Sequence, residues 1–243
     1  MTLKNRIAFV TGANRGIGRA LTEALLAAGA AKVYAAARNP GSLPDFGDSR
    51  VVPVTLDITD PSQVADAAGF ADDVDLLINN AGVLSFGGLA DAAADDLRRD
   101  MEVNYFGTLD VVRAFLPTLK RSGNADIVNV ASIVSFVSFP MLGGYSASKA
   151  ALYSVTQGLR TELAPLGIRV HSVNPGPIDT DMAADIEMDK TSPEETARNI
   201  LTGIETGNGD IFPDPAGEQM FGVWRDDYRQ LEANVAAMAA ENQ

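Results

Sequence analysis

The sequence contains no cysteine and only one histidine, His171. The lack of cysteine excludes disulfides, thiolate metal sites and a cysteine nucleophile. A lone histidine excludes a histidine-rich metal site, and we predict no metal. Basic residues are also scarce, with 19 Lys and Arg against 32 Asp and Glu and a net charge of −13. This balance argues against nucleic-acid binding, which needs clustered positive charge, and disfavours docking to acidic carrier proteins or anionic membranes.

Long apolar runs are absent as well. No run approaches the roughly 20 residues that span a bilayer. The N-terminus, MTLKNRIAFV, lacks the long apolar core and cleavage site of a secretory signal, so we expect a cytoplasmic protein without membrane partners. The composition, 46% hydrophobic and 21% charged, is ordinary for a globular protein with a substantial core.

Apolar, β-rich runs alternate with amphipathic stretches along the whole chain. Strands are predicted at 6–11, 32–37, 50–56, 74–78, 125–131, 168–173 and 210–212, and helices at 17–28, 61–70, 94–116, 144–164 and 193–206. Strands without polar alternation suit a parallel sheet that is buried on both faces. The pattern predicts a doubly wound, Rossmann-type parallel sheet in three α/β/α layers. No linker or repeat divides residues 1–243, so we expect a single domain.

The C-terminal residues 214–243 are predicted to form a helical extension of this domain. Tyr228, Leu231, Val235 and Met238 recur at helical spacing and place a helix at 226–240. Its apolar stripe is expected to pack on the body or on a second subunit. His171, inside a predicted central strand, is interpreted as a packed core residue.

The segment TGANRGIG at 11–18 joins the first strand to the first helix. Its spacing is G-x-x-x-G-x-G, so the usual G-x-G-x-x-G fingerprint does not apply, and a purely structural turn is the alternative. Its place in the first βαβ unit nevertheless favours dinucleotide binding. Ala37 and Arg38 end the second strand where NAD binders often carry an acidic residue. Arg15 and Arg38 could hold a 2′-phosphate, which favours NADP(H) over NAD(H), unless both are solvated surface residues.

The segment YSASK at 145–149 raises the question of acid–base chemistry. Tyr145 and Lys149 would share one helix face, where an ammonium can lower the pKa of a nearby phenol. Pairs at this spacing are more often ordinary helix surface, so the five residues alone leave both interpretations open.

Seven motifs in order make the chain resemble the short-chain dehydrogenase/reductase family over most of its length. They are TGANRGIG at 11–18, LDIT at 56–59, NNAG at 79–82, Asn104 in MEVNYFGT, Ser132 in VNVASI, YSASK at 145–149 and NPGPIDT at 174–180. The resemblance implies four catalytic residues. Tyr145 would be the general acid or base, and Lys149 would bind the nicotinamide ribose and lower the pKa of Tyr145. Ser132 would stabilise the substrate oxygen, and Asn104 would hold a water linked to Lys149.

The resemblance also implies a set of cofactor-binding residues, with NADP(H) preferred and NAD(H) possible. Tyr145 and Lys149 belong to this set as well. Its other members are Gly12, Asn14, Arg15, Gly16, Ile17 and Gly18 in the glycine turn, Arg38 at the 2′-phosphate, Asp57 and Ile58 at the adenine, Asn80, Ala81 and Gly82 at the adenosine ribose, and Pro175, Gly176, Ile178 and Thr180 over the nicotinamide.

The predicted substrate is a small carbonyl or secondary alcohol, with an apolar or aromatic compound favoured. Expected apolar contacts are Phe136, Phe139, Met141, Leu142, Met182, Ile186 and Met188, although inward packing is the alternative for several of them. Two other functions remain open: a 3-oxoacyl-[acyl-carrier-protein] reductase and a non-catalytic NADP(H)-binding redox sensor. By resemblance we also expect a homodimer or homotetramer formed through the helices at 94–116 and 144–164.

Overall fold

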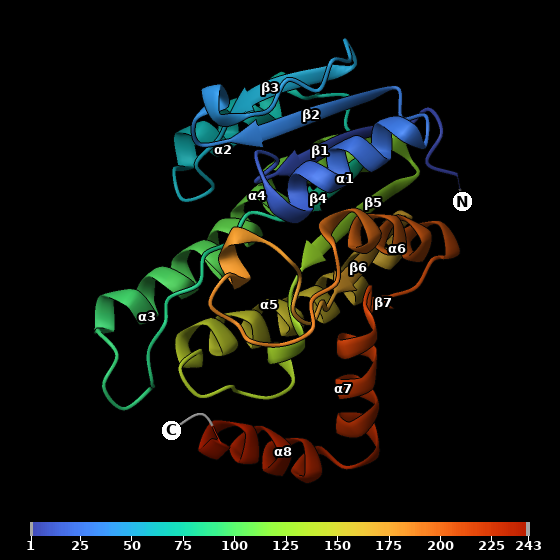
Figure 1. The fold of residues 1–243 in the computed structure, drawn as a ribbon. Helices are drawn as coiled ribbons and strands as arrows, with labels where there is room; N and C mark the ends of the chain where they lie inside the picture. The colour runs from blue at the N-terminus through green and yellow to red at the C-terminus, as the bar shows by residue number, and fades with distance from the viewer. Residues whose placement is uncertain (1, 242–243) are drawn as a thin grey trace.

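The computed structural model describes residues 2–241 and contains a seven-stranded parallel sheet (Figure 1). The strands are β1 (Ile7–Thr11), β2 (Lys32–Ala37), β3 (Val51–Thr55), β4 (Leu76–Asn79), β5 (Ala125–Val130), β6 (Ile168–Val173) and β7 (Asp210–Ile211). Their order in the sheet is β3-β2-β1-β4-β5-β6-β7, which reverses direction between β1 and β4. This is a Rossmann-like doubly wound fold, and it confirms the predicted fold class and all seven strands.

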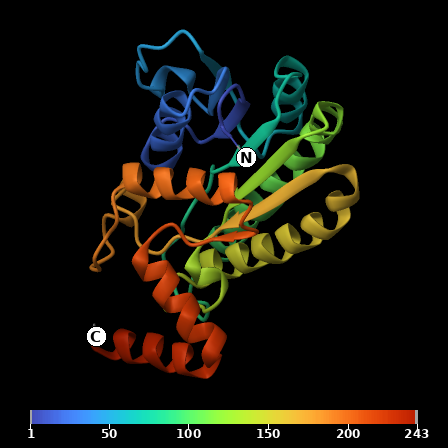
Figure 2. The same cartoon turned by 90° about the vertical axis from the view of Figure 1, so that its right-hand side faces the viewer.

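Helices cover both faces of the sheet, as the two views in Figures 1 and 2 show. On one face α1 (Gly16–Ala27) and α6 (Pro193–Thr206) pack against the strands through side chains such as Leu21, Leu25 and Ile200. On the other face lie α2 (Pro61–Phe70), α4 (Thr108–Ser122) and α5 (Gly143–Leu163), with Phe115 and Leu119 buried against Phe9. Strands enclosed in this way have no solvent face, which explains their continuous apolar sequences.

The predicted single helix over 94–116 is wrong in detail. The segment consists of α3 (Ala94–Met101), a π-helical stretch over Glu102–Gly107, and then α4. Asn104 lies in the π-helical stretch, and its side chain is completely buried. π-Helical turns are rare and are found mostly at functional sites.

The C-terminal extension contains two helices rather than the one predicted. Before α8 (Tyr228–Glu241) comes α7 (Pro215–Asp226), which the sequence analysis missed. Asp214 caps α7 by accepting a hydrogen bond from the Gly217 amide at 2.8 Å, and Pro215 occupies the first helical position. Leu231 and Val235 of α8 pack with Val137 on the same chain, whereas Tyr228 and Met238, the outer members of the apolar stripe, are exposed. Among the described residues, no helix has the length and apolar character needed to cross a membrane.

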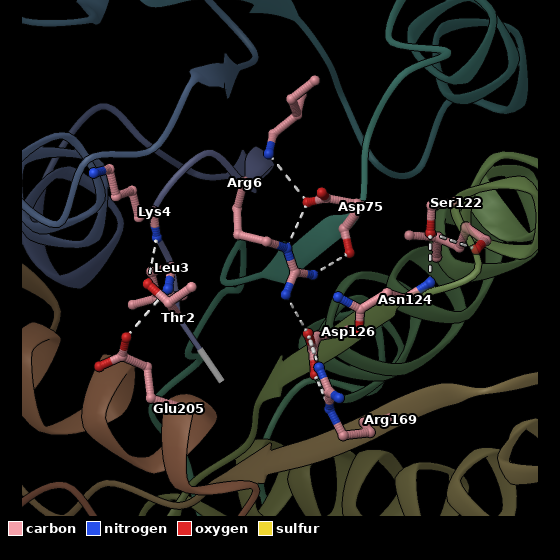
Figure 3. Close-up of polar contacts among 12 residues, drawn as sticks. Thr2, Leu3, Lys4, Arg6, Asp75, Ser122, Asn124, Asp126, Arg169 and Glu205 are labelled. Carbon is pink, nitrogen blue, oxygen red and sulfur yellow. Dashed lines mark hydrogen bonds and ion pairs between the residues drawn. The ribbon is translucent and has the colours of Figure 1, made fainter.

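A cluster of charged residues joins the amino ends of four neighbouring strands (Figure 3). Asp126, which is fully buried, binds Arg6 at 2.8 Å, Arg169 at 2.6 Å and the Nε2 atom of His171 at 3.0 Å. Arg6 also pairs with Asp75 at 2.8 Å. The other ring nitrogen of His171 lies 2.6 Å from the Asn208 carbonyl oxygen. This confirms that His171 is a packed, hydrogen-bonded core residue.

Candidate active site

A cleft with a volume of about 1190 Å³ runs along the carboxyl ends of the strands. Ligands of open α/β sheets bind at this edge, next to the point where the strand order reverses. The cleft brings together 17 of the 18 predicted cofactor residues, from the glycine turn to the 175–180 segment, with Tyr145 and Lys149 between them. Gly18 is the exception, because it is buried beneath the turn rather than exposed to the cleft.

The glycine turn between β1 and α1 has the shape of a phosphate cradle. Gly12 and Gly16 have φ angles of +67° and +53°, which residues with side chains rarely adopt. A Cβ atom on Gly18 would lie 2.2 Å from the Gly12 carbonyl oxygen, so only glycine fits there. No side chain caps the start of α1, which leaves its first amide groups available at the edge of the cleft. These features fit a dinucleotide phosphate group.

Asn80 braces this turn from the neighbouring strand. Its side-chain nitrogen, Nδ2, donates hydrogen bonds to the backbone carbonyl oxygens of Thr11 and Gly12, at 3.0 and 3.1 Å. The hydroxyl of Thr11 in turn accepts hydrogen bonds from the amides of Asn80 and Ala81, each at 3.0 Å. The NNAG motif therefore fixes the floor of the cleft to the glycine turn.

The two arginines predicted at the 2′-phosphate have different surroundings. Arg15 forms an exposed ion pair with Asp181, with 2.9 Å between Nη1 and Oδ2, which links the glycine turn to the segment after Thr180. Arg38 is exposed at the rim of the cleft and forms no ion pair with any residue in the range 2–241. Asn39 and Ser42, which the sequence analysis did not select, line the cleft beside it.

The helix α5 carries both Tyr145 and Lys149 into the cleft. Lys149 is only 4% exposed, and its amine donates a hydrogen bond to the Val130 carbonyl oxygen at 2.7 Å. The same amine lies 5.6 Å from the centre of the Tyr145 ring. Ser132 lies just after β5, and its hydroxyl is 3.3 Å from the Val134 amide and 3.4 Å from the Pro175 carbonyl oxygen. The same hydroxyl interacts with the hydroxyl of Tyr145. Three side chains able to donate or move protons thus face one cavity.

Asn104 supports this group from behind. Its side-chain oxygen accepts a hydrogen bond from the Val83 amide at 2.9 Å. Its nitrogen donates to the Val83 carbonyl and to the Ser148 hydroxyl, both at 2.9 Å. A Cβ atom on Gly82 would lie 3.0 Å from Asn104 Oδ1 and 3.6 Å from Lys149 Nζ, so glycine leaves room at this point.

Burial controls the acidity of the two central groups. Burial raises the pKa of Tyr145 to about 12. The hydroxyl of Ser132 lowers this pKa, and the charge of Asp100 raises it further. Burial also lowers the pKa of Lys149 to about 8, and the charge of Asp100 opposes this change. Desolvation of the phenolate therefore dominates the pKa of Tyr145. The expected lowering of this pKa by Lys149 beside a bound cofactor stays a prediction.

The wall beyond Ser132 is apolar but differs from the prediction. Phe139, Leu142, Met182, Ile186 and Met188 line the cleft as expected. Phe136 does not, because its ring packs among Tyr153, Phe212, Phe221 and Trp224. Met141 is also outside the cleft, 58% exposed with a φ angle of +65°. Met220 of α7 completes the wall, and it was missed together with its helix. Among the described residues, no group of three or more metal-ligating side chains is arranged to hold a metal ion.

Comparisons with known proteins agree with this geometry. The family described as short chain dehydrogenase matches residues 6–191. An uncharacterised oxidoreductase of Staphylococcus aureus strain MW2 is 35% identical over 215 residues, covering 83% of this chain and 92% of that protein. The crystal structure of a short chain dehydrogenase from Burkholderia cenocepacia J2315 in complex with NADP is 43% identical. It has a TM-score of 0.92 and covers 97% of this chain and 99% of that one.

A second solved structure extends the likeness. A short chain dehydrogenase/reductase from Burkholderia phymatum in complex with NAD is 26% identical, with a TM-score of 0.86 and coverage of 95% and 96%. The motifs, the fold and the extent of these matches lead to one assignment. The chain belongs to the short-chain dehydrogenase/reductase family of oxidoreductases.

Proposed function

We propose that the protein is an NADP(H)-dependent carbonyl reductase or alcohol dehydrogenase acting on apolar or aromatic compounds. The observation that carries the proposal is the meeting of Ser132, Tyr145 and Lys149 with the glycine turn in one cleft. The exposed guanidinium of Arg38 and the NADP complex of the Burkholderia cenocepacia relative support NADP(H) over NAD(H). Asp57, Ile58 and the residues around Asn80 and Ile178 would hold the rest of the cofactor.

The side chains divide the proposed reaction between them. The bound cofactor supplies the hydride that reduces the carbonyl carbon. The hydroxyl of Tyr145 donates its proton to the carbonyl oxygen, which yields the secondary alcohol. The Ser132 hydroxyl donates a hydrogen bond to the same oxygen and stabilises the charge that develops there. Lys149 holds the cofactor ribose and supplies positive charge near the phenol, and Asn104 fixes the backbone behind it.

The apolar wall supports the choice of substrate class. Phe139, Leu142, Ile186 and Met220 offer a surface that desolvates an alkyl or aromatic group, and they carry no group that would pair with a phosphate. A 3-oxoacyl-[acyl-carrier-protein] reductase is the second candidate. It is ranked lower because the segment 179–189 next to the cleft carries five acidic residues, which would repel an acidic carrier protein.

A non-catalytic NADP(H)-binding redox sensor is the third candidate. A protein that only binds the cofactor has no need of Ser132, Tyr145 and Lys149 together, and this ranks the sensor below the enzyme. We further propose a cytoplasmic homodimer or homotetramer. Phe106, 47% exposed near the end of the π-helical stretch that precedes α4, is a suitable contact for a second copy.

The test is oxidation of NADPH and of NADH with a panel of ketones and aldehydes, followed by the ultraviolet absorbance of the reduced cofactor. Tyr145→Phe is expected to lower kcat/KM by at least about 10²-fold, the usual contribution of a general acid. Tyr153→Phe is the matched control, because Tyr153 lies on the same helix but outside the cleft. Full activity in Tyr145→Phe, or tight NADPH binding without turnover of any carbonyl, would contradict the proposal.

A further inference from the structure

Asp100 is a buried carboxylate at the end of α3 that the proposed reaction leaves without a role. Its side chain has no solvent exposure. One oxygen, Oδ1, accepts a hydrogen bond from the Ser85 hydroxyl at 2.9 Å. The other, Oδ2, is buried without a hydrogen-bond partner, and no cation in the range 2–241 forms an ion pair with Asp100. An unsatisfied buried carboxylate oxygen is costly, so its place in the fold requires a reason.

The unpartnered oxygen of Asp100 faces the beginning of the helix that carries Tyr145. A Cβ atom on Gly144, the residue before Tyr145, would lie 3.0 Å from Oδ2 of Asp100 and 2.7 Å from Leu97 Cδ2. Glycine at this position therefore lets α3 and α5 approach each other. No side chain caps the first turn of α5, and a negative charge next to a helix N-terminus is favourable.

The charge of Asp100 also acts on the two residues at the centre of the cleft. Burial sets the main direction of their pKa values, and Asp100 raises the pKa of both Tyr145 and Lys149. The pKa of Asp100 itself is raised by burial, against the hydroxyl and amide of Ser85 and the charge of Arg99, while Asp96 adds to the increase. Arg99 and Asp96 are on the same helix as Asp100, and their effects on its pKa partly offset each other. On α5, the charge of Asp100 acts on Tyr145 and Lys149.

We propose that Asp100 is a positioning residue whose buried carboxylate, held by Ser85 against the first turn of α5, keeps Tyr145 and Lys149 in their protonated forms. A buried lysine loses its proton easily, and an anion nearby counteracts this. Asp100 thereby extends to higher pH the range in which Lys149 is a cation and Tyr145 a proton donor. This inference rests on the proposed function, because it assigns Asp100 to the same site.

The test compares the pH dependence of kcat/KM for carbonyl reduction in the wild type and in Asp100→Asn, which keeps the shape and removes the charge. Removing an anion favours the phenolate of Tyr145 and the neutral amine of Lys149, so both protons are lost at lower pH. The midpoint of the alkaline limb is expected to move down by roughly 1 pH unit, a shift of the size that a neighbouring charge commonly produces in a folded protein. Asp110→Asn is the control, because Asp110 lies on the exposed side of α4 and its variant should keep the wild-type profile.

A second measurement follows the protonation of Lys149 and does not require catalysis. Acetylation of Lys149 by acetic anhydride, measured by peptide mass spectrometry at a series of pH values, should have its midpoint at lower pH in Asp100→Asn than in the wild type. If the wild type reduces no carbonyl, the proposed function fails, and this labelling still decides the role of Asp100. Coincident profiles and coincident labelling midpoints would make Asp100 merely structural and overturn the inference. Asp100→Ser removes the same charge and replaces the asparagine variant if that one does not fold.

Discussion

Replacing Asp126 by asparagine should destabilise the protein strongly without touching the cleft. The Asp126 carboxylate binds Arg6, Arg169 and His171 at 2.8, 2.6 and 3.0 Å, and none of its side chain is exposed. Asparagine has nearly the same shape but no charge, so Arg6, which is 6% exposed, would lose one of its two carboxylate partners. Removing one member of a buried ion pair typically costs about 3–5 kcal/mol.

Arg6 keeps Asp75, and this places the expected loss near the lower end of that range, about 3 kcal/mol. For a domain of this size, 1 kcal/mol corresponds to a change in Tm of about 2–4 °C, so Tm should fall by about 6–12 °C. The assay is thermal unfolding followed by circular dichroism. Asp226→Asn is the control, because the Arg225–Asp226 pair is exposed on both sides and should contribute little.

The pH dependence gives a second test of the same reasoning. Burial alone would raise the pKa of Asp126, but hydrogen bonds from His171 and Arg169 and the charge of Arg6 hold it well below its usual range. A carboxyl with a depressed folded-state pKa contributes stability above its unfolded pKa, about 3.9, and this contribution is lost as the pH falls further. The Tm difference between wild type and Asp126→Asn should therefore narrow below about pH 4. A difference that is absent at pH 7, or constant down to pH 2, would refute the reasoning.

Two further predictions concern the cofactor and are both measured by fluorescence titration. Arg38→Ala should weaken NADPH binding by about 10-fold to 100-fold, the effect of losing one charge-assisted hydrogen bond, and should leave NADH binding unchanged. Equal effects on both cofactors would show that Arg38 does not bind the 2′-phosphate. Asp181→Asn frees Arg15 from its exposed ion pair. NADPH binding should become at most about fivefold tighter, since such pairs contribute about 1 kcal/mol or less. Weaker NADPH binding would show instead that Asp181 supports the site.

The sheet could be predicted because its strands are buried on both faces. Runs such as IAFVT in β1 and LLIN in β4 have no solvent side, and this leaves little choice of secondary structure. Once the strands are parallel, the motif residues that follow them must meet at one edge. This is why 17 cofactor residues predicted from separate motifs line one cleft.

The features that escaped prediction depend on contacts distant in sequence. The π-helical stretch at Glu102–Gly107 has no local signature, and the side chain of its central Asn104 is fixed by Val83, 21 residues earlier. The orientation of Phe136 is set by Phe212, just after β7, and by Phe221 of α7, which no local pattern reveals. In contrast, α7 carried a readable signal that was overlooked. Asp214 followed by Pro215 is the same signal, a capping side chain and a first-turn proline, that Ser192 and Pro193 provide at the start of α6.

Buried acids at the two ends of the sheet contrast in a way that bears on function. At the amino ends, Asp126 is surrounded by cations and all its interactions serve stability. Near the carboxyl ends, Asp100 is equally buried yet has one oxygen without a partner, beside the helix of Tyr145. Sites where a polar group stays unsatisfied are expected where function constrains the fold. The two variants should therefore have different effects. Asp126→Asn should lower Tm and leave the pH dependence of kcat/KM unchanged, whereas Asp100→Asn should shift the pH dependence of kcat/KM.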